Sequence, residues 1–418
     1  MIKRIKYSAA AKKDTLALID RINKSSEEIP AAVDEIIGQV AKKGDLALKE
    51  LSLKLDGVAP AAFRVPAALI KKSYSSLDRK LKKAMETALS HIRAYHRLQR
   101  KSIKDYTYKN RGYTVRHKYI PVNSAGIYIP GGQAPLFSTV FMAAVPAVEA
   151  GVKRIVIVSP PRCKGEVNPY ILAAAYMAGV SEIYRVGGAQ AVAALALGTQ
   201  SITKVDKVAG PGNIYSTMAK RRLFGKIGID AISGPSEITI IADKTAAPLF
   251  IYYDLMAQAE HTGGHSLLIT DSKAVADAVE ALFIRHKTGS TADVTIITVK
   301  NMKEAVMLAE YKAPEHLAVF AKNSGSIIKQ ITNSPAIFEG NYSPVAFGDY
   351  MAGSNHILPT NGTARFFSAL SVLDFMKHTH IVKCSKAAIE TFGPDAELMA
   401  GTETLNNHMM SIRVRRQK

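Results

Sequence analysis

The sequence predicts an α/β protein with two Rossmann-like α/β domains built on parallel sheets, together with a helical N-terminal segment and a C-terminal arm. Two observations support this prediction. From residue 128 onward, short apolar runs bounded by turn residues alternate with segments in which apolar residues recur at helical spacing. This alternation occurs in two successive series, and strands that alternate with helices form mostly parallel sheets covered by helices.

Before the first series the pattern is helical. Apolar residues at helical spacing predict helices within 30–56 and 66–98, and a turn at 109–112 leads into extended runs at 113–119 and 126–129. The first series then predicts strands and helices in alternation, at 154–159, 170–178, 182–186, 189–196 and 207–209.

The second series shows the same alternation of strands and helices. Its predicted strands and helices are 237–242, a helix that holds Gln258, 266–270, 273–283, 293–298, 302–310 and 316–320. Past Pro335 glycines mark turns, and the chain ends in helix-like segments on either side of Gly393-Pro394, at 385–392 and 395–405, followed by 408–415.

Composition limits the class of protein. With 47% apolar residues the chain can bury real cores, and the longest apolar run, 136–152, is interrupted by Pro146 and Glu149 and is too short to span a bilayer. The N-terminus lacks the apolar segment of a signal peptide, and the two cysteines, Cys163 and Cys384, form no C-x-x-C pair. These features indicate a cytoplasmic protein without disulfides.

The net charge of +20 is unevenly distributed, because residues 1–120 hold 27 Lys and Arg against 12 Asp and Glu. A basic surface of this size attracts polyanions, so a catalytically silent protein that binds nucleic acid or polyphosphate is one reading. The basic residues, however, lie in helix-like segments without interleaved aromatic residues, and no nucleic-acid-binding motif is present. A solvated, lysine-rich helix face is the preferred interpretation.

Candidate binding residues follow from local spacing. Gln258 and His261 are three residues apart near the end of a predicted helix, which places an amide oxygen and an imidazole on one face. Such a pair either holds one side of a metal ion or belongs to a hydrogen-bonded helix end. His265 is four residues beyond His261, but Gly263-Gly264 breaks the helix and no H-E-x-x-H motif forms.

Three glycine clusters, at 128–132, 186–190 and 210–213, each follow a predicted strand of the first series. Open parallel sheets present ligand-binding loops at the carboxyl ends of their strands, so these loops are expected to line one cleft. None has the G-x-G-x-x-G pattern, and a tight turn is the alternative for each.

An acid and an imidazole, Glu315 and His316, stand at the start of a buried strand. Neighbouring strand residues point to opposite faces, so the two share a site only if the backbone bends, which Pro314 favours. Histidine is a natural acceptor for an alcohol proton and glutamate can take a proton from water, although a backbone carbonyl can also satisfy such a histidine. Asp349 and His408 would complete an N/O shell with Gln258 and His261, but their spacing alone leaves this open.

From about residue 30 to the C-terminus the chain resembles the histidinol dehydrogenase family. Seven ordered blocks carry the resemblance, at 128–139, 186–195, 204–213, 227–237, 257–261, 313–317 and 348–360. Family members oxidise L-histidinol to L-histidine in two NAD-dependent steps through a retained aldehyde, with one Zn²⁺ per subunit. They are homodimers in which the C-terminal segment reaches the active site of the partner.

The resemblance implies a set of functional residues. It places the zinc ligands, which also contact the substrate, at Gln258, His261, Asp349 and His408. It places the catalytic pair at Glu315 and His316, further substrate contacts at Ser236 and Glu403, and NAD contacts at Tyr128, Gln190 and Asn213. Zinc would hold the imidazole and amine of the substrate, His316 would accept the alcohol proton, and Glu315 would activate water on the bound aldehyde.

We expect the following division of the chain on this basis: an N-terminal arm at 1–22, a larger α/β domain from 23–126 and 236–372, a smaller Rossmann-like domain with the cofactor-binding loops at 127–235, and a C-terminal dimerisation arm at 373–418.

Three positions depart from the family pattern. Val345 stands where the family commonly has glutamate, the segment 261–265 carries an unusual Gly-Gly and a second histidine, and a two-residue shift of the C-terminal alignment would exchange His408 for Asn406. His408 is preferred because Glu403 then also matches. The alternative function is a paralogous zinc- and NAD-dependent dehydrogenase of another small polar alcohol, such as a sulfonated diol.

Overall fold

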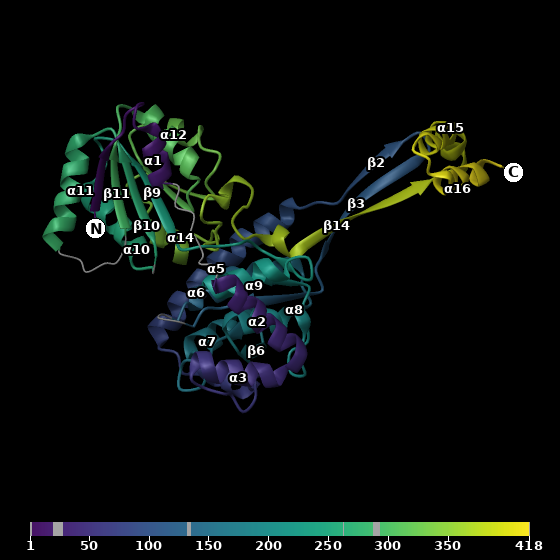
Figure 1. Cartoon of the computed structure of the whole chain (residues 1–418), viewed down its shortest axis with the longest axis horizontal. Helices are drawn as coiled ribbons and strands as arrows, with labels where there is room; N and C mark the ends of the chain where they lie inside the picture. The colour runs from purple at the N-terminus through teal and green to yellow at the C-terminus, as the bar shows by residue number, and fades with distance from the viewer. Residues whose placement is uncertain (1, 20–27, 132–134, 262, 287–292, 418) are drawn as a thin grey trace.

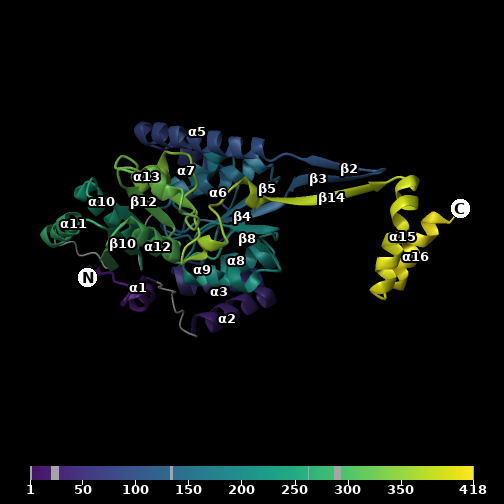
Figure 2. The same cartoon turned by 90° about the horizontal axis from the view of Figure 1, so that it is seen from above.

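The computed structural model describes residues 2–19, 28–131, 135–261, 263–286 and 293–417. Two α/β bodies lie side by side, and a long arm of strands and helices extends from them (Figure 1). Viewed from above, the arm again projects beyond both bodies and carries the C-terminus at its far end (Figure 2). No helix in the described ranges is long and apolar enough to cross a membrane.

The first body is a five-stranded sheet in the order β6-β5-β4-β7-β8, with every neighbouring pair parallel. Its strands are β4 (Ser124–Tyr128), β5 (Arg154–Ser159), β6 (Glu182–Arg185), β7 (Lys207–Ala209) and β8 (Gly228–Ile229). In chain order this is 3-2-1-4-5, the strand order of a Rossmann-type sheet. The order reverses between β4 and β7, where such sheets bind ligands at the carboxyl ends of their strands.

The helices between these strands are α6 (Phe137–Ala150), α7 (Pro169–Ala178), α8 (Gly188–Leu197) and α9 (Ile214–Leu223). Helix α6 occupies the long apolar run of the sequence and is buried around most of its circumference. A helix that is apolar on all sides lacks the amphipathic period, so periodicity alone does not identify it.

The second body is a six-stranded sheet, again entirely parallel, in the order β1-β11-β10-β9-β12-β13. Its strands are β1 (Ile2–Lys6), β9 (Glu237–Ala242), β10 (His265–Thr270), β11 (Asp293–Thr298), β12 (His316–Phe320) and β13 (Ala336–Glu339). Its helices are α1 (Lys12–Ile19), α10 (Pro248–Ala259), α11 (Lys273–His286), α12 (Met302–Lys312), α13 (Ser324–Ile328) and α14 (Val345–Tyr350). The two parallel sheets covered by helices confirm the predicted fold class.

The N-terminus differs from the expected charged arm at 1–22. Residues 2–6 form edge strand β1, paired in parallel with β11, and helix α1 contacts α12. Ile2 packs against the core of this body, and Arg4 forms ion pairs of 2.5 Å with Asp277 and Glu280 of α11. The basic residues of this segment hid the strand, because its two apolar residues, Ile2 and Ile5, are three positions apart and give no alternating pattern.

The helices that follow also lie elsewhere than expected. They are α2 (Glu28–Lys43), α3 (Asp45–Asp56), α4 (Ala67–Ser75) and α5 (Arg79–Ser102). Helix α2 packs on α8 and α9, α4 on α7, and α5 on α6. They therefore cover the five-stranded sheet, whereas the expected division grouped 23–126 with 236–372. The apolar faces of α2 and α3 share one core with β5 and α8, which explains this location.

The arm is an antiparallel sheet of β2 (Tyr106–Asn110), β3 (Tyr113–Pro121) and β14 (Met376–Cys384), in the order β14-β3-β2. Two short 3₁₀ helices, Thr363–Arg365 and Val372–Phe375, precede β14. The sheet carries α15 (Lys386–Thr402) and α16 (Asn406–Arg416), which pack on each other at its tip. The helix break predicted at Gly393-Pro394 is wrong, because α15 continues through Pro394.

Helix α10 contains a buried acid. Asp254 lies on the buried side of this helix, and burial raises the pKa of its carboxyl from 3.8 to about 6. The unfolded chain releases this proton near pH 4 and the folded protein only near pH 6, so folding becomes less favourable as the pH rises through that window. Above pH 6 the free-energy cost of burying the ionised carboxylate is fully present, and a shift of this size corresponds to about 3 kcal/mol.

We therefore expect Asp254→Asn to raise the free energy of unfolding by up to about 3 kcal/mol at pH 7.5 and by less than about 1 kcal/mol at pH 4. Urea unfolding at the two pH values measures the difference. An equal gain at both pH values would mean that the change acts through packing and not through ionisation.

Candidate active site

The predicted catalytic pair lies at the start of β12, beside β9 in the centre of the six-stranded sheet. The chain enters this strand by a sharp turn, since Ala313 has a φ of 49° in the left-handed region. The bend expected at Pro314 is present, and it brings Oε2 of Glu315 to 3.5 Å from Nδ1 of His316. Both residues are buried, since only 5% of the surface of Glu315 and 4% of the surface of His316 is exposed.

The backbone of one residue, Glu237, holds both of these side chains. The backbone N–H of Glu237 donates to Oε2 of Glu315 at 2.8 Å, and the backbone carbonyl of Glu237 accepts from Nδ1 of His316 at 3.1 Å. A carbonyl can only accept, so Nδ1 carries a hydrogen, and in the neutral imidazole Nε2 holds the free lone pair. Nε2 is buried and has no hydrogen-bond partner. In its neutral form His316 is therefore oriented as a proton acceptor.

A buried ion pair fixes this part of the backbone. The carboxylate of Glu237 pairs with the ammonium of Lys312, and both side chains are at most 4% exposed. The other carboxylate oxygen accepts from the backbone N–H of Asn361 at 3.2 Å. Burial raises the pKa of Glu237, and Lys312 opposes that rise. Neither Glu237 nor Lys312 was predicted, because a sequence does not show that a charge is buried.

Asp349 and His356 complete the polar surroundings of His316. Oδ1 of Asp349 lies 3.9 Å from Nε2 of His316, and the Asp349 carbonyl accepts from Nδ1 of His356 at 3.0 Å. Burial opposes protonation of His316, but the nearby carboxylates of Glu315 and Asp349 outweigh it and raise its pKa to about 10. Burial lowers the pKa of His356. Sequence reasoning missed His356, although it stands inside one of the blocks that carry the family resemblance.

Helix α10 approaches this group through its contact with α14, which carries Asp349. Gln258, in the last turn of α10, is 3% exposed and its Oε1 has no hydrogen-bond partner. The expected common helical face of Gln258 and His261 is absent, because α10 ends at Ala259 and His261 is exposed in the turn beyond it. Ser236, half-buried before β9, accepts from the backbone N–H of His265 at 3.1 Å through its carbonyl.

Two of the predicted residues lie far along the chain from this group. Glu403 caps the C-terminal end of α15, His408 lies in α16, and both are exposed at the tip of the arm. Within the described ranges of a single chain, no three His, Cys, Asp or Glu side chains are grouped so that they could hold a metal ion. The structure thus places Gln258 and Asp349 on contacting helices but brings neither Glu403 nor His408 to them.

The donor types nevertheless fit zinc. The buried Oε1 of Gln258 lacks a partner, Asp349 offers a carboxylate, and His261 offers an exposed imidazole. Zinc binds imidazole nitrogen and carboxylate oxygen, and an amide oxygen is an uncommon further ligand. Three donors of these types and one further imidazole would make a four-ligand zinc shell.

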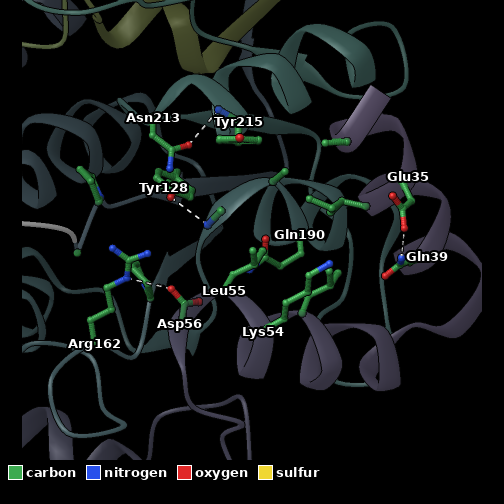
Figure 3. A pocket seen from close by; sticks show the side chains of 18 residues that line it. Glu35, Gln39, Lys54, Leu55, Asp56, Tyr128, Arg162, Gln190, Asn213 and Tyr215 are labelled. Carbon is green, nitrogen blue, oxygen red and sulfur yellow. Dashed lines mark hydrogen bonds and ion pairs between the residues drawn. The ribbon is translucent and has the colours of Figure 1, made fainter. Parts of the chain in front are cut away.

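A cavity of about 460 Å³ opens at the carboxyl edge of the five-stranded sheet, where the strand order reverses (Figure 3). All three predicted cofactor residues line it, and its walls come from β4, the starts of α8 and α9, the loop after β5, and helices α2 and α3. The three glycine clusters thus contribute to one cleft, as predicted. None of the described residues that line it comes from the six-stranded sheet, so the cavity and the predicted catalytic pair belong to different bodies.

Each of the three cofactor residues has a defined position. The Tyr128 hydroxyl accepts from the backbone N–H of Gly188 at 3.0 Å, and burial raises its pKa. Asn213 caps α9, with Oδ1 accepting from the backbone N–H of Tyr215 at 3.1 Å. Gln190 is 1% exposed and its Oε1 has no hydrogen-bond partner. A ligand in the cavity would meet an acceptor oxygen that lacks a donor.

The ion pair behind the catalytic residues generates a prediction. Lys312→Met leaves the buried Glu237 without its partner, so we expect a loss of about 3–5 kcal/mol of unfolding free energy and reduced turnover. Lys312→Met combined with Glu237→Gln should recover most of the stability, since neither charge remains. The matched control is Lys273→Met, which breaks an exposed pair with Asp277 and should cost at most about 1 kcal/mol. Urea unfolding of the four proteins measures these values, and a Lys312→Met protein as stable as the control would contradict the role of the pair.

Known proteins share the sequence and the fold. The family model described as histidinol dehydrogenase matches residues 19–416. Histidinol dehydrogenase of Bradyrhizobium diazoefficiens is 44% identical over 93% of each chain, and that of Synechococcus sp. is 40% identical over 100% of this chain and 99% of its own. The structure of histidinol dehydrogenase from Elizabethkingia anophelis matches with a TM-score of 0.91 at 32% identity, over 99% of this chain and 97% of that one. The chain therefore belongs to the histidinol dehydrogenase family of NAD-dependent oxidoreductases.

Proposed function

We propose that this chain oxidises L-histidinol to L-histidine in two NAD-dependent steps, with zinc positioning the substrate. The observation that supports this function best is the arrangement of His316. Its Nδ1 is fixed by the Glu237 carbonyl, its Nε2 is free, and the Glu315 carboxylate lies beside it. An alcohol needs one proton acceptor to become an aldehyde, and the aldehyde needs an activated water to become an acid. The buried pair offers a group for each proton.

In this proposal Nε2 of His316 takes the alcohol proton in the first oxidation, while the hydride leaves to NAD, which would bind in the cavity of the five-stranded body. Oε1 of Glu315, which the Glu237 amide leaves free, takes a proton from water in the second. Burial of both side chains keeps bulk water from the aldehyde, which favours its retention.

Gln258, His261 and Asp349 would hold the zinc ion together with His408, and Ser236 and Glu403 would contact the substrate. Zinc supplies no redox chemistry and would act by gripping the imidazole and amine of histidinol. Engagement of Asp349 with a cation would remove one of the two carboxylate charges that raise the pKa of His316. Burial, which lowers the pKa of His316, would then have the larger effect, and the neutral imidazole would be available as a base.

Metal removal tests the zinc assignment. We expect chelation to abolish histidinol turnover while the circular dichroism spectrum and the unfolding transition persist, because each sheet has its own core. Turnover should return on addition of zinc in a stoichiometry of one ion per subunit. Full activity in protein verified to be free of metal would refute the assignment, and a preference for another polar alcohol would favour the paralogous function.

We further infer that two subunits share their active sites. The arm extends from both bodies, and side chains on one face of its sheet are exposed, among them Tyr106 at 59%, Tyr108 at 53% and Val382 at 63%. An exposed apolar face of this kind requires a covering surface. A symmetric homodimer would cover it twice and carry His408 of each subunit to the other.

Mixed dimers test this sharing. His408→Asn and Glu315→Gln chains should each have low activity as homodimers. In a mixed dimer one site would receive an intact His408 and an intact Glu315, and the other would carry both changes. Refolding the two chains together should restore up to about half of the wild-type activity per mixed dimer. Verified mixed dimers without recovery would show that the arm completes its own subunit's site or that His408 is not a ligand.

A further inference from the structure

Asp56, which the sequence did not single out, has an unsatisfied oxygen at the cavity of the five-stranded body. It is the last residue of α3, and its side chain is 4% exposed. Oδ1 accepts from Nε of Arg162 at 3.0 Å, and Figure 3 shows the two side chains facing each other in the cavity wall. Oδ2 is buried and has no hydrogen-bond partner. A buried carboxylate oxygen without a donor is costly, so its position points to a donor on a ligand.

The place of this carboxylate in the fold identifies the kind of donor. In Rossmann-type sheets an acid beyond the first strand–helix unit accepts a hydrogen bond from the 2′-hydroxyl of the adenosine ribose. In this chain the loop that follows the second strand, β5, begins Pro160-Pro161-Arg162 and offers no acid at that point. Arg162 instead holds the carboxylate of Asp56, which comes from the N-terminal helices. The acid is thus supplied from outside the sheet.

The pairing also decides which dinucleotide the cavity accepts. An arginine at this place accommodates the 2′-phosphate of NADP in related sheets. Here Asp56 engages Nε of Arg162, and the free Oδ2 would repel a phosphate. The other acid of the cavity, Glu35, is on α2 and already accepts from the amide of Gln39 at 2.9 Å. Of the two acids, Asp56 is the one whose second oxygen is buried without a partner, so it gains most from a hydrogen bond with a ribose hydroxyl.

We propose that Asp56 is the residue that selects NAD over NADP. Its Oδ2 accepts a hydrogen bond from the 2′-hydroxyl of the adenosine ribose, and its Oδ1 holds Arg162 away from phosphate binding. This inference rests on the proposed use of the cavity for NAD.

The test compares wild type, Asp56→Ser and Asp56→Asn as full-length enzymes, with histidinol as substrate and NAD or NADP as coenzyme. Loss of a charged hydrogen bond should raise the KM for NAD about tenfold or more, with kcat changed by at most about twofold. Release of Arg162 should raise the ratio of kcat/KM for NADP to that for NAD by about 100-fold. Combining Asp56→Ser with Arg162→Gln should remove the gain with NADP.

Glu35→Gln is the matched control, because it changes a carboxylate of the same cavity that is bonded to Gln39 and not to Arg162 and that has no buried unpaired oxygen. Its coenzyme ratio should stay within about twofold of wild type. Calorimetry adds a readout that needs no turnover. Wild type should bind ADP-ribose more tightly than its 2′-phosphorylated form, and Asp56→Ser should lose that preference.

Three results for Asp56→Ser would overturn the assignment. They are an equal fall in kcat/KM with both coenzymes, an unchanged KM for NAD, and weaker binding of nicotinamide mononucleotide in place of ADP-ribose. If wild type fails to oxidise histidinol but keeps the calorimetric preference, the proposed function falls and the role of Asp56 stands.

Discussion

The backbone of Glu237 is the point on which the arrangement of Glu315 and His316 depends. Its N–H fixes one carboxylate oxygen of Glu315, and its carbonyl fixes the hydrogen on Nδ1 of His316. This backbone stays in place because the side chain of Glu237 is anchored by Lys312 and by the backbone of Asn361. Lys312 is the last residue of α12, and Glu237 is the first residue of β9, so a helix and a strand of the six-stranded body meet beside Glu315 and His316. Rigid elements position such groups more accurately than loops do.

The parallel sheets were predictable because their strands are short apolar runs with clear ends. Strands β5, β7, β9, β11 and β12 had been predicted at 154–159, 207–209, 237–242, 293–298 and 316–320, and the structure gives the same bounds. Fully buried strands of parallel sheets produce this signal over a few residues. The elements that the sequence did not predict are those that depend on partners far away along the chain. Strand β14 is largely polar and exists through its pairing with β3, more than 250 residues earlier, so no local pattern reveals it.

The candidate site was predictable to a similar degree and for a related reason. Glu315 and His316 stood out because they interrupt an apolar context, and the cavity loops stood out through their glycines. Lys312, His356 and Asp56 did not stand out, since their roles arise from burial and from neighbours on other elements. The two parts of the candidate site also lie on different bodies. The cavity belongs to the five-stranded body and the catalytic pair to the six-stranded one, and a contact of 3.4 Å between Thr139 of α6 and His356 links them.

Edge strand β1 has a consequence for the order in which the chain can fold. Its partner β11 begins at Asp293, so the residues of β1 have no sheet to join until about 290 further residues have been made. At about 5–20 residues per second, that interval is roughly 15–60 s. During it the strand is an open hydrogen-bonding edge, the kind of segment that pairs wrongly with other chains. Lys3, Arg4 and Lys6 give it three positive charges, which oppose such pairing until α11 supplies the acids that neutralise Arg4.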